Sequence, residues 1–405
     1  MDTHQAGPQS KLAAPLPEAH RATWPLRWTA LASDQAARCG QLHSPHGSVQ
    51  TPAFMAVGTL GSLKGITVQQ AEALGQEILL ANTYHLALRP GAEVVHQLGG
   101  VHGLSGWRGP MLTDSGGYQV FSLADNRQLD ESGVRFKSHL DGSTLHLTPE
   151  ESIRVQRFLG ADIIMAFDEC PDLDASPDAL RASIERTLRW LERSVQSWRD
   201  QQQGWPGGAE SQALFGIVQG GLDQELRHFS AKHTLAHELP GYAIGGLSVG
   251  ESAYERNQVL DWVTPLLPAD RPRYLMGVGT PLDLVEAVYR GIDLFDCVLP
   301  TRMGRHGIAY TDAGPLHLKR QQYRADARVI DEDTPSEASR VSRGTIRHLL
   351  HSGESLGGQL LGIHNLAYYQ RLMRRVRTAI QRSEMGNFVE NFRRTYQPRE
   401  ADSQQ

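Results

Sequence analysis

The sequence predicts an α/β protein, built as a (β/α)8 TIM barrel with insertions. Its 405 residues can bury one large core, and 40% hydrophobic, 21% charged residues and 40 glycines describe a globular protein. Short apolar runs end in glycine or polar clusters and are followed by helical patterns, which predicts alternating strands and helices. No Gly-x-Gly-x-x-Gly fingerprint with a downstream acid follows the early strands, which favours a closed barrel over an open dinucleotide-binding sheet.

The elements follow one another in a regular order. Strands are predicted at 78–81, 162–167, 213–218, 242–245, 273–277 and 294–299, and helices at 68–74, 150–159, 177–201, 224–235, 253–267 and 281–290. One helix start has a clear physical basis, because Thr148 can cap the helix, Pro149 suits its first turn and Glu151 can complete a capping box.

The ends of the chain lack a helical or strand period. Residues 1–24 and 391–405 are therefore expected to be flexible tails around one barrel at 25–390. Cys39, Cys170 and Cys297 lie far apart and form no obvious disulfide framework, which suits a reducing cytoplasm. The first residues lack the apolar core of a secretory signal, and no apolar run approaches the roughly 20 residues that span a bilayer, so we expect a cytoplasmic protein that does not enter membranes.

Positive charge is concentrated near the carboxyl end. The net charge is −5, but residues 340–383 contain one acid, Glu354, and the arginines Arg340, Arg343, Arg347, Arg371, Arg374, Arg375, Arg377 and Arg382. This segment is a candidate phosphate-binding face, although an ordinary solvated helix surface explains such a run equally simply.

Several polar groups fall at the carboxyl ends of predicted strands, where parallel barrels carry their chemistry. Asp168 follows one strand, Gln219 the next, Gly246 and Leu247 a third, and Asp296 sits within the last. Asp296 has apolar neighbours, and a carboxylate buried there is costly unless it is paired or functional. Such a carboxylate can attack an anomeric carbon and expel a base, and the alternative is a structural Asp that accepts backbone hydrogen bonds.

A glycine-rich segment at 113–119, TDSGGYQ, supplies a second carboxylate, Asp114. Its small residues, Ser115 among them, permit close approach of a ligand, and Tyr118 offers a flat face for stacking a base. The alternative is an Asp that bonds its own backbone in a turn.

The same set of residues can recognise a purine. A carboxylate such as Asp168 matches N1–H and the exocyclic amine, and Gln219 with the Gly246 N–H can donate to the carbonyl. Met276 and Tyr118 could sandwich the ring, although a lone Met in a strand is more often a core residue.

Together these motifs resemble the tRNA-guanine transglycosylases, also called queuine tRNA-ribosyltransferases, over about residues 38–380. The matching segments are 51–55 (TPAFM), 82–86 (NTYHL), 113–119 (TDSGGYQ), 138–143 (SHLDGS), 165–170 (MAFDEC), 216–221 (GIVQGG), 245–251 (GGLSVGE), 274–279 (YLMGVG), 295–302 (FDCVLPTR) and 364–366 (HNL).

The resemblance implies a barrel with insertions and assigns a role to each matched position. Asp296 matches the nucleophile and Asp114 the general acid/base. The base-recognition positions are Asp168, Gln219, Gly246, Leu247 and Ser115, and Tyr118 and Met276 match the residues that sandwich the base. Arg302 and Arg305 match arginines near the tRNA backbone, and the family implies tRNA and a 7-deazaguanine base as partners and a homodimer as the assembly.

The pocket resembles its bacterial version. Cys170 and the bulky Val249 leave little room for the cyclopentenediol of queuine, so the expected incoming base is 7-aminomethyl-7-deazaguanine. Glu251 and the Leu247 carbonyl would then serve its aminomethyl group.

One family feature is missing. The family usually carries zinc on Cys-x-Cys-x-x-Cys and a later His, in an insertion that spans about 318–365 here. The three thiolate positions hold Asp333, Pro335 and Ala338, and only His364 is retained. Because tetrahedral zinc needs about four ligands, we expect no zinc there, and no other cofactor. Asp333, His348 and His364 could form an oxygen and nitrogen site, but packing roles are more usual for such histidines.

The leading function is therefore exchange of guanine at the tRNA wobble position through a covalent aspartyl-ribose intermediate, in queuosine biosynthesis. Two alternatives stay open, a non-catalytic RNA-binding paralogue or partner subunit, and a transglycosylase that acts on another nucleic acid such as DNA.

Overall fold

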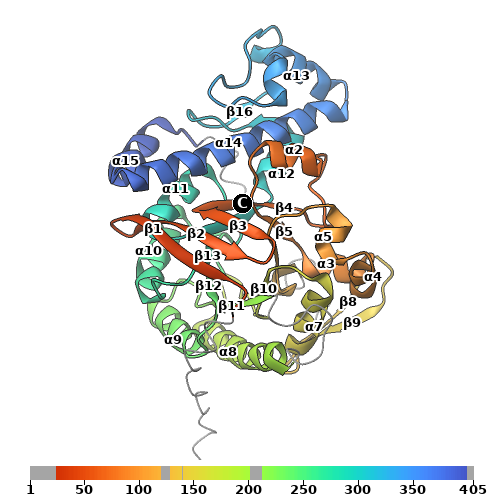
Figure 1. The fold of residues 1–405 in the computed structure, drawn as a ribbon, viewed down its shortest axis with the longest axis vertical. Coiled ribbons are helices and arrows are strands. Elements are labelled where there is room, and N and C mark those ends of the chain that lie inside the picture. Colours follow the sequence, from red (N-terminus) through yellow and green to blue (C-terminus); the bar gives the residue numbers. More distant parts are fainter. Residues whose placement is uncertain (1–23, 120–127, 139, 201–211, 399–405) are drawn as a thin grey trace, which may run out of the picture.

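The computed structural model describes residues 24–119, 128–138, 140–200 and 212–398, and its centre is a closed barrel of eight parallel strands. The strands follow one another around the barrel in chain order (Figure 1): β4 (Ala53–Val57), β5 (Leu79–Ala81), β6 (Met111–Thr113), β10 (Ile163–Met165), β11 (Ala213–Val218), β12 (Gly241–Ile244), β13 (Arg273–Leu275) and β14 (Leu294–Cys297). The predicted (β/α)8 barrel is confirmed, and all eight carboxyl ends meet at one rim.

Sequence patterns predicted six of these strands and missed β4 and β6. β6 has three residues, and β4 is buried along its whole length, so neither shows an alternating pattern. Three predicted strands extend too far: β10 ends at Met165, β13 ends at Leu275, and β14 ends at Cys297 because α12 (Leu299–His306) starts directly after it.

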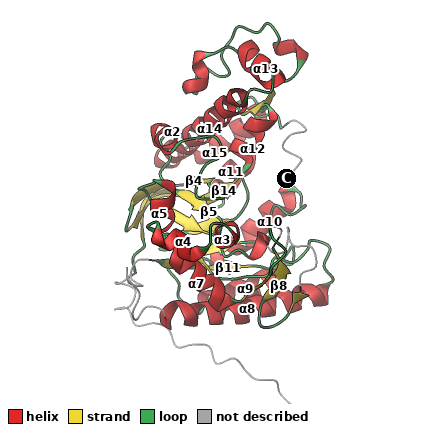
Figure 2. Ribbon diagram, turned by 90° about the vertical axis from the view of Figure 1, so that its right-hand side faces the viewer, coloured by secondary structure: helices red, strands yellow, loops and turns green. Residues whose placement is uncertain are grey.

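The six predicted helices exist and surround the barrel (Figures 1 and 2): α2 (Val68–Ala73), α7 (Pro149–Leu159), α8 (Pro177–Asp200), α9 (Gln224–Leu235), α10 (Ala253–Val263) and α11 (Pro281–Tyr289). The Thr148 side chain accepts the Glu151 N–H at 3.2 Å, as predicted. The predicted reciprocal half of that capping box is wrong, because the Glu151 carboxylate pairs with Arg154 at 2.8 Å.

Smaller sheets and helices decorate the barrel. Short helices α3 (Thr83–Leu88), α4 (Ala92–Gln97) and α5 (Gly100–Ser105) link β5 to β6, and the three-stranded sheet of β7 (Gln128–Leu129), β8 (Val134–Lys137) and β9 (Thr144–Leu147) precedes α7. A second antiparallel sheet, of β1 (Arg27–Asp34), β2 (Ala37–Ser44) and β3 (Gly47–Thr51), lies across the amino-terminal end (Figure 1). Its Trp28, Leu42 and Val49 join the core inside the barrel, which closes that end and leaves the opposite rim for chemistry.

A small subdomain follows α12 and projects from the barrel (Figure 1). It contains β15 (Ile308–Ala309), β16 (Leu316–His317), the 3-10 turns Gln321–Tyr323 and Glu337–Arg340, α13 (Arg343–His351) and the start of α14 (Ser355–Gln381). A separate apolar core holds it together: Ala309, Leu318, Tyr323, Ile330, Ala338, Ile346, Leu360 and Leu361.

The prediction that a flexible tail begins at residue 391 is wrong. α15 (Met385–Thr395) continues through residue 391, and Phe392 and Tyr396 are buried against the barrel helices because they lie on the apolar face of that helix. Residues 1–23 and 399–405, where the rest of both predicted tails falls, lie outside the described residues. None of the helices in the described parts of the chain combines the length and the apolar character that crossing a membrane requires.

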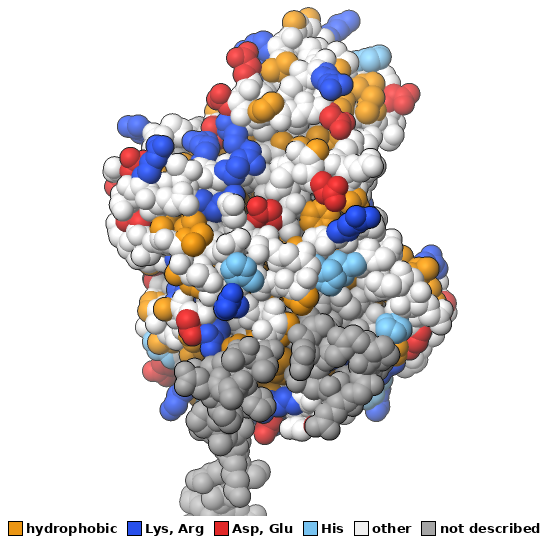
Figure 3. All heavy atoms as spheres, viewed as in Figure 1, with side chains coloured by type: hydrophobic (Ala, Val, Ile, Leu, Met, Phe, Trp, Pro, Cys, Tyr) orange, Lys and Arg blue, Asp and Glu red, His pale blue; other side chains and the backbone are white. Residues whose placement is uncertain are grey.

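The arginines of 340–383 do not form one free basic face. Arg343 donates to the carbonyls of Val329 and Ile330, Arg377 is buried and donates to Pro52, and Arg371 and Arg375 pair with Asp312 at 2.8 and 2.7 Å. Basic side chains do gather beside α14 and α15 in Figure 3, but on the face that carries β1–β3. Much of the run therefore serves internal contacts, so neither a phosphate-binding face nor an ordinary solvated helix surface describes it.

Candidate active site at the carboxyl rim

A cavity of about 470 Å³ opens at the carboxyl ends of the strands. It brings together nearly all the residues that the sequence singled out, from β6 to α12: Asp114, Ser115, Tyr118, Asp168, Cys170, Gln219, Gly246, Leu247, Val249, Met276, Asp296 and Arg302. Arg305 does not line the cavity and is exposed on α12. Residues as far apart in the chain as Asp114 and Arg302 converge because strand ends in a closed parallel barrel share one rim.

Asp296 lies at the end of β14 and is held on one side only. Its Oδ1 accepts the Tyr274 hydroxyl at 2.6 Å and the Gly277 N–H at 2.8 Å, whereas no described residue hydrogen-bonds to Oδ2. Burial raises the pKa of Asp296, and these two hydrogen bonds oppose that rise by stabilising the anion. The arrangement fixes the carboxylate and leaves Oδ2 without a partner among the described residues at the cavity wall.

Asp114, directly after β6, accepts hydrogen bonds on both oxygens. Oδ1 accepts the Thr83 N–H at 2.8 Å, and Oδ2 accepts the amides of Gln119, at 2.7 Å, and Asn82. Burial, assisted by the charge of Asp296, raises the pKa of Asp114 to about 6 despite these bonds. A carboxyl with a pKa near 6 can both give and take a proton near neutral pH.

Asp168 and Gln219 face each other across the rim. The Gln219 Nε2 donates to Asp168 Oδ2 at 2.7 Å, and the Ser115 hydroxyl donates to Oδ1 at 3.2 Å. Burial raises the pKa of Asp168 to about 6. The pair therefore offers acceptors and a donor side by side, the groups that a guanine edge requires.

Flat and apolar groups form the rest of the wall. Tyr118 is 50% exposed at the mouth, and Met276 is partly buried at the end of β13. Burial raises the pKa of the Cys170 thiol to about 12, so this side chain stays neutral and acts as a wall rather than a nucleophile.

Glu251 does not line the cavity, contrary to its expected place at an aminomethyl group. Its carboxylate accepts the N–H groups of Ser248 and Val249 at 2.7 and 3.0 Å and pairs with Arg256 at 2.8 Å. These bonds fix the loop after β12, and of the two residues expected at the aminomethyl group only Leu247 lines the cavity.

Sequence reasoning gave no role to Asn82, Gln119 and Tyr274, which hold the two catalytic candidates in place. All three lie inside motifs that carried the family resemblance, so the motif boundaries were the available signal. Each contact joins separate strand ends or a loop, which local pattern cannot reveal.

The positions of the family's usual zinc ligands do not fit a zinc ion here. Ala338 is buried in the apolar core of the subdomain, and Pro335 has no ligand atom. Asp333 is exposed and lies 3.9 Å from Arg371, and His364 uses Nε2 in a 2.9 Å hydrogen bond to the Tyr310 carbonyl. A single oriented imidazole and one exposed carboxylate do not make a tetrahedral site.

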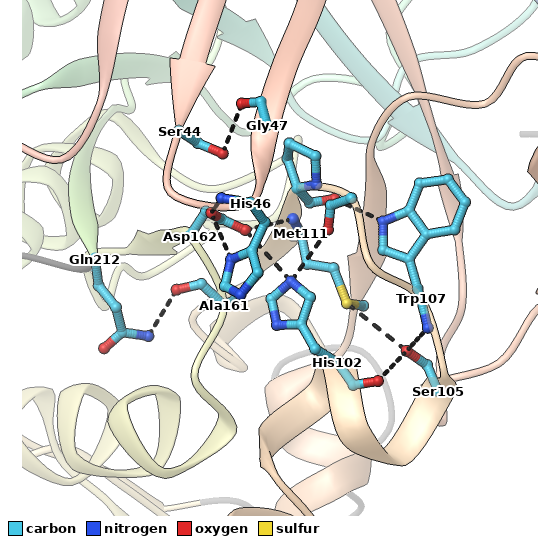
Figure 4. Close-up of polar contacts among 12 residues, drawn as sticks. Ser44, His46, Gly47, His102, Ser105, Trp107, Met111, Ala161, Asp162 and Gln212 are labelled. Atoms are coloured by element: carbon cyan, nitrogen blue, oxygen red, sulfur yellow. Dashed lines mark hydrogen bonds and ion pairs between the residues drawn. The ribbon is translucent and has the colours of Figure 1, made fainter. Parts of the chain in front are cut away.

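Within the described residues, one other group has metal-ligand composition, at the amino-terminal end of the barrel: His46, His102 and Asp162. His46 Nδ1 lies 2.9 Å from Asp162, His102 Nε2 lies 3.1 Å from the Gly109 carbonyl, and the two rings stack 3.7 Å apart (Figure 4). A shared metal ion would require both rings to direct their lone pairs at one point, and nearly parallel rings do not. We therefore interpret the cluster as a structural contact that joins the β2–β3 turn to β10.

Comparisons with known proteins agree with the site. A family model described as queuine tRNA-ribosyltransferase matches residues 33–398. A queuine tRNA-ribosyltransferase of Thermus thermophilus is 52% identical over 371 residues, 91% of this chain and 94% of that protein. Those of Rhizobium meliloti and Bacillus velezensis are 50% and 47% identical, and each alignment covers 89% of this chain and 94% or 93% of the relative.

The substitution Asp168→Asn is expected to stabilise the protein at neutral pH but not in acid. A carboxyl whose folded pKa is about 6 against an ordinary 3.8 disfavours folding once it ionises, and the cost grows as pH rises from about 4 to 6. Relative to wild type, the variant's free energy of unfolding should rise by up to about 3 kcal/mol between pH 4 and 8. Urea unfolding at several pH values measures this, and a difference that stays constant with pH would refute it.

Chelation is expected to leave the subdomain folded, because apolar packing rather than thiolates holds its core. EDTA should not change the unfolding temperature or the hydrogen exchange of residues 316–361. Ile346→Ala should instead weaken that region by roughly 2–5 kcal/mol, since it opens a cavity in the core. Loss of protection on chelation alone would contradict this expectation.

Proposed function

Because the chain belongs to the queuine tRNA-ribosyltransferase family, it is a tRNA-guanine transglycosylase, and we propose that Asp296 and Asp114 perform the base exchange by double displacement. The observation that carries this proposal is that both carboxylates line one cavity together with Asp168 and the possible stacking groups Tyr118 and Met276. Their differing environments support two different roles.

In the first half-reaction, Asp296 Oδ2 attacks C1′ of the guanosine ribose. The C1′–N9 bond breaks, an ester forms between Asp296 and C1′, and guanine leaves with a proton on N9 from the Asp114 carboxyl. The hydrogen bonds of Tyr274 and Gly277 to Oδ1 hold the attacking carboxylate as an anion.

In the second half-reaction, the incoming base binds in place of guanine. Asp114 takes the proton from its N9, N9 attacks C1′, and Asp296 leaves as a free carboxylate. Two inversions give overall retention at C1′, and because one N-glycosidic bond replaces another, the exchange needs no redox step.

Base recognition falls to the groups on the opposite wall. Asp168 accepts from N1–H and the exocyclic amine, and Gln219 and the Gly246 N–H donate to the carbonyl. Ser115 orients Asp168, Leu247 closes the floor, and Tyr118 and Met276 cover the ring faces.

We infer that the incoming base is 7-aminomethyl-7-deazaguanine, because Cys170 and Val249 narrow the cavity where a larger 7-substituent would extend. Arg302, at the edge of the cavity, and Arg305, one turn further along α12, would contact the tRNA backbone. The homodimer that the family resemblance implies is part of the same proposal. Light scattering with and without tRNA, which measures the molar mass of the particle, tests it.

Wild-type protein is expected to incorporate radiolabelled guanine into unmodified tRNA, and Asp296→Asn should reduce incorporation by at least about a thousandfold by removing the nucleophile. Circular dichroism and guanine binding provide the folding controls. Arg273→Met, at the amino-terminal end of the barrel, is a control variant outside the cavity.

The same assay separates the alternatives. Incorporation into duplex DNA but not tRNA would favour another nucleic-acid substrate. Tight tRNA binding with no incorporation by well-folded wild type would favour the non-catalytic RNA-binding alternative and contradict the proposed function.

Val249→Gly is expected to widen the cavity and admit bases with larger 7-substituents. Removing three carbon atoms from the wall should lower KM for queuine relative to 7-aminomethyl-7-deazaguanine by about tenfold or more, with kcat for guanine little changed. An unchanged preference would show that Val249 does not limit the size of the base.

A further inference from the structure

Arg227 is a fully buried cation directly behind the base-recognition wall. It lies on α9, and its guanidinium donates to three carbonyls: Nε to Gly221 at 2.8 Å, and Nη1 to Val218 and to Gly245 at 2.9 Å. These carbonyls flank Gln219 and Gly246, the two donors assigned to the base carbonyl. Burial lowers the pKa of Arg227 to about 10, so it stays charged at neutral pH.

One nitrogen of the Arg227 guanidinium donates no hydrogen bond in the part of the chain that the structure describes. Among the described residues, Arg227 Nη2 has no hydrogen-bond partner, and neither does Gln219 Oε1. Both atoms border the space beside Gly246: a Cβ added there would meet Gln219 Oε1 at 2.3 Å and Arg227 Nη2 at 3.7 Å. Gly246 also has φ +67, a conformation that favours glycine. It therefore carries no side chain that would compete with the Gln219 amide for this space.

Base binding must change the bonds of Gln219. Without a base, its Nε2 donates to Asp168 Oδ2, and that bond alone sets which way the amide faces. On the proposed function, Asp168 turns its oxygens to N1–H and the exocyclic amine. Gln219 then needs another partner to fix its orientation, because an amide can present either its donor or its acceptor to a base.

We propose that Arg227 is the positioning residue that orients Gln219 and so makes the pocket select a carbonyl at C6 of the base. A guanidinium only donates, so Oε1 must face Nη2, and Nε2 must face the base. The reversed amide would put donors against the guanidinium and an acceptor against the carbonyl. This inference rests on the proposed function and adds a second source of discrimination against 6-aminopurines, beside the N1–H that Asp168 accepts.

The test compares binding of guanine and 2,6-diaminopurine by calorimetry for wild type and Arg227→Met. The guanine preference should fall by about tenfold to a hundredfold, since an unoriented amide satisfies either group. Arg273→Met is the matched control, because Arg273 is also a buried arginine that donates to backbone carbonyls, those of Leu267 and Gly291, at the other end of the barrel. It should lower stability and leave the preference unchanged.

A double-mutant cycle separates positioning from simple structural support. If Arg227 acts through the amide, the losses of guanine affinity in Arg227→Met and Gln219→Met should not add in the double variant. Additive losses, or a full guanine preference in a folded Arg227→Met, would overturn the inference.

A second variant covers the case in which Arg227→Met does not fold. Gln219→Glu keeps an acceptor for Nη2 and removes the donor, so it should fold and lose the guanine preference, whereas a retained preference would overturn the inference. Wild type that neither binds guanine nor exchanges it would instead refute the proposed function, which keeps the two failures distinguishable.

Discussion

The burial of carboxylates at one rim of the barrel is the constraint on which the site depends. Asp114 and Asp168 are buried and Asp296 is partly buried, and hydrogen bonds rather than ion pairs with cations stabilise all three carboxylates. Burying charge in this way opposes folding, so the rest of the fold must supply the stability. The closed barrel with its plugged amino-terminal end provides that stability and leaves the polar groups at the open end.

In the proposed mechanism, the hydrogen-bond partners of the three carboxylates assign a different role to each. Asp296 is held through one oxygen and keeps the other for attack, whereas Asp114 is held through both and sits near the pKa that proton transfer needs. Asp168 is bound only by side chains that can move, Ser115 and Gln219. A nucleophile, a proton carrier and a recognition group can therefore share one amino-acid type because their surroundings differ.

The sequence predicted the barrel, six of its strands and a set of site residues of which nearly all line the cavity, because strand–helix alternation and polar groups after strands are local patterns. It missed β4 and β6, which are short or wholly buried, and the contacts of Tyr274, Asn82 and Arg227, which join residues distant along the chain. The arginine run at 340–383 shows the opposite error. Composition suggested a surface, but the partners of Arg343, Arg371 and Arg377 are internal.

In the subdomain, apolar packing takes the place of the metal ligands that are usual in the family. Where relatives of the family usually place thiolates, this chain buries Ala338 among Ile330, Ile346 and Leu361 and pairs Arg371 with acids on the adjoining loop. The fold of this region then depends on apolar area rather than on metal ligands, while the catalytic rim, built on the barrel strands, is unaffected.

The central claim is that Asp296 becomes covalently bonded to ribose. Wild type and Asp296→Asn are incubated with unmodified tRNA, denatured, digested with nuclease and protease, and examined by mass spectrometry. A ribose-linked adduct on the peptide that contains Asp296, absent from the variant, is the predicted result. Efficient base exchange with no adduct, or an adduct on Asp114 instead, would contradict the double-displacement mechanism.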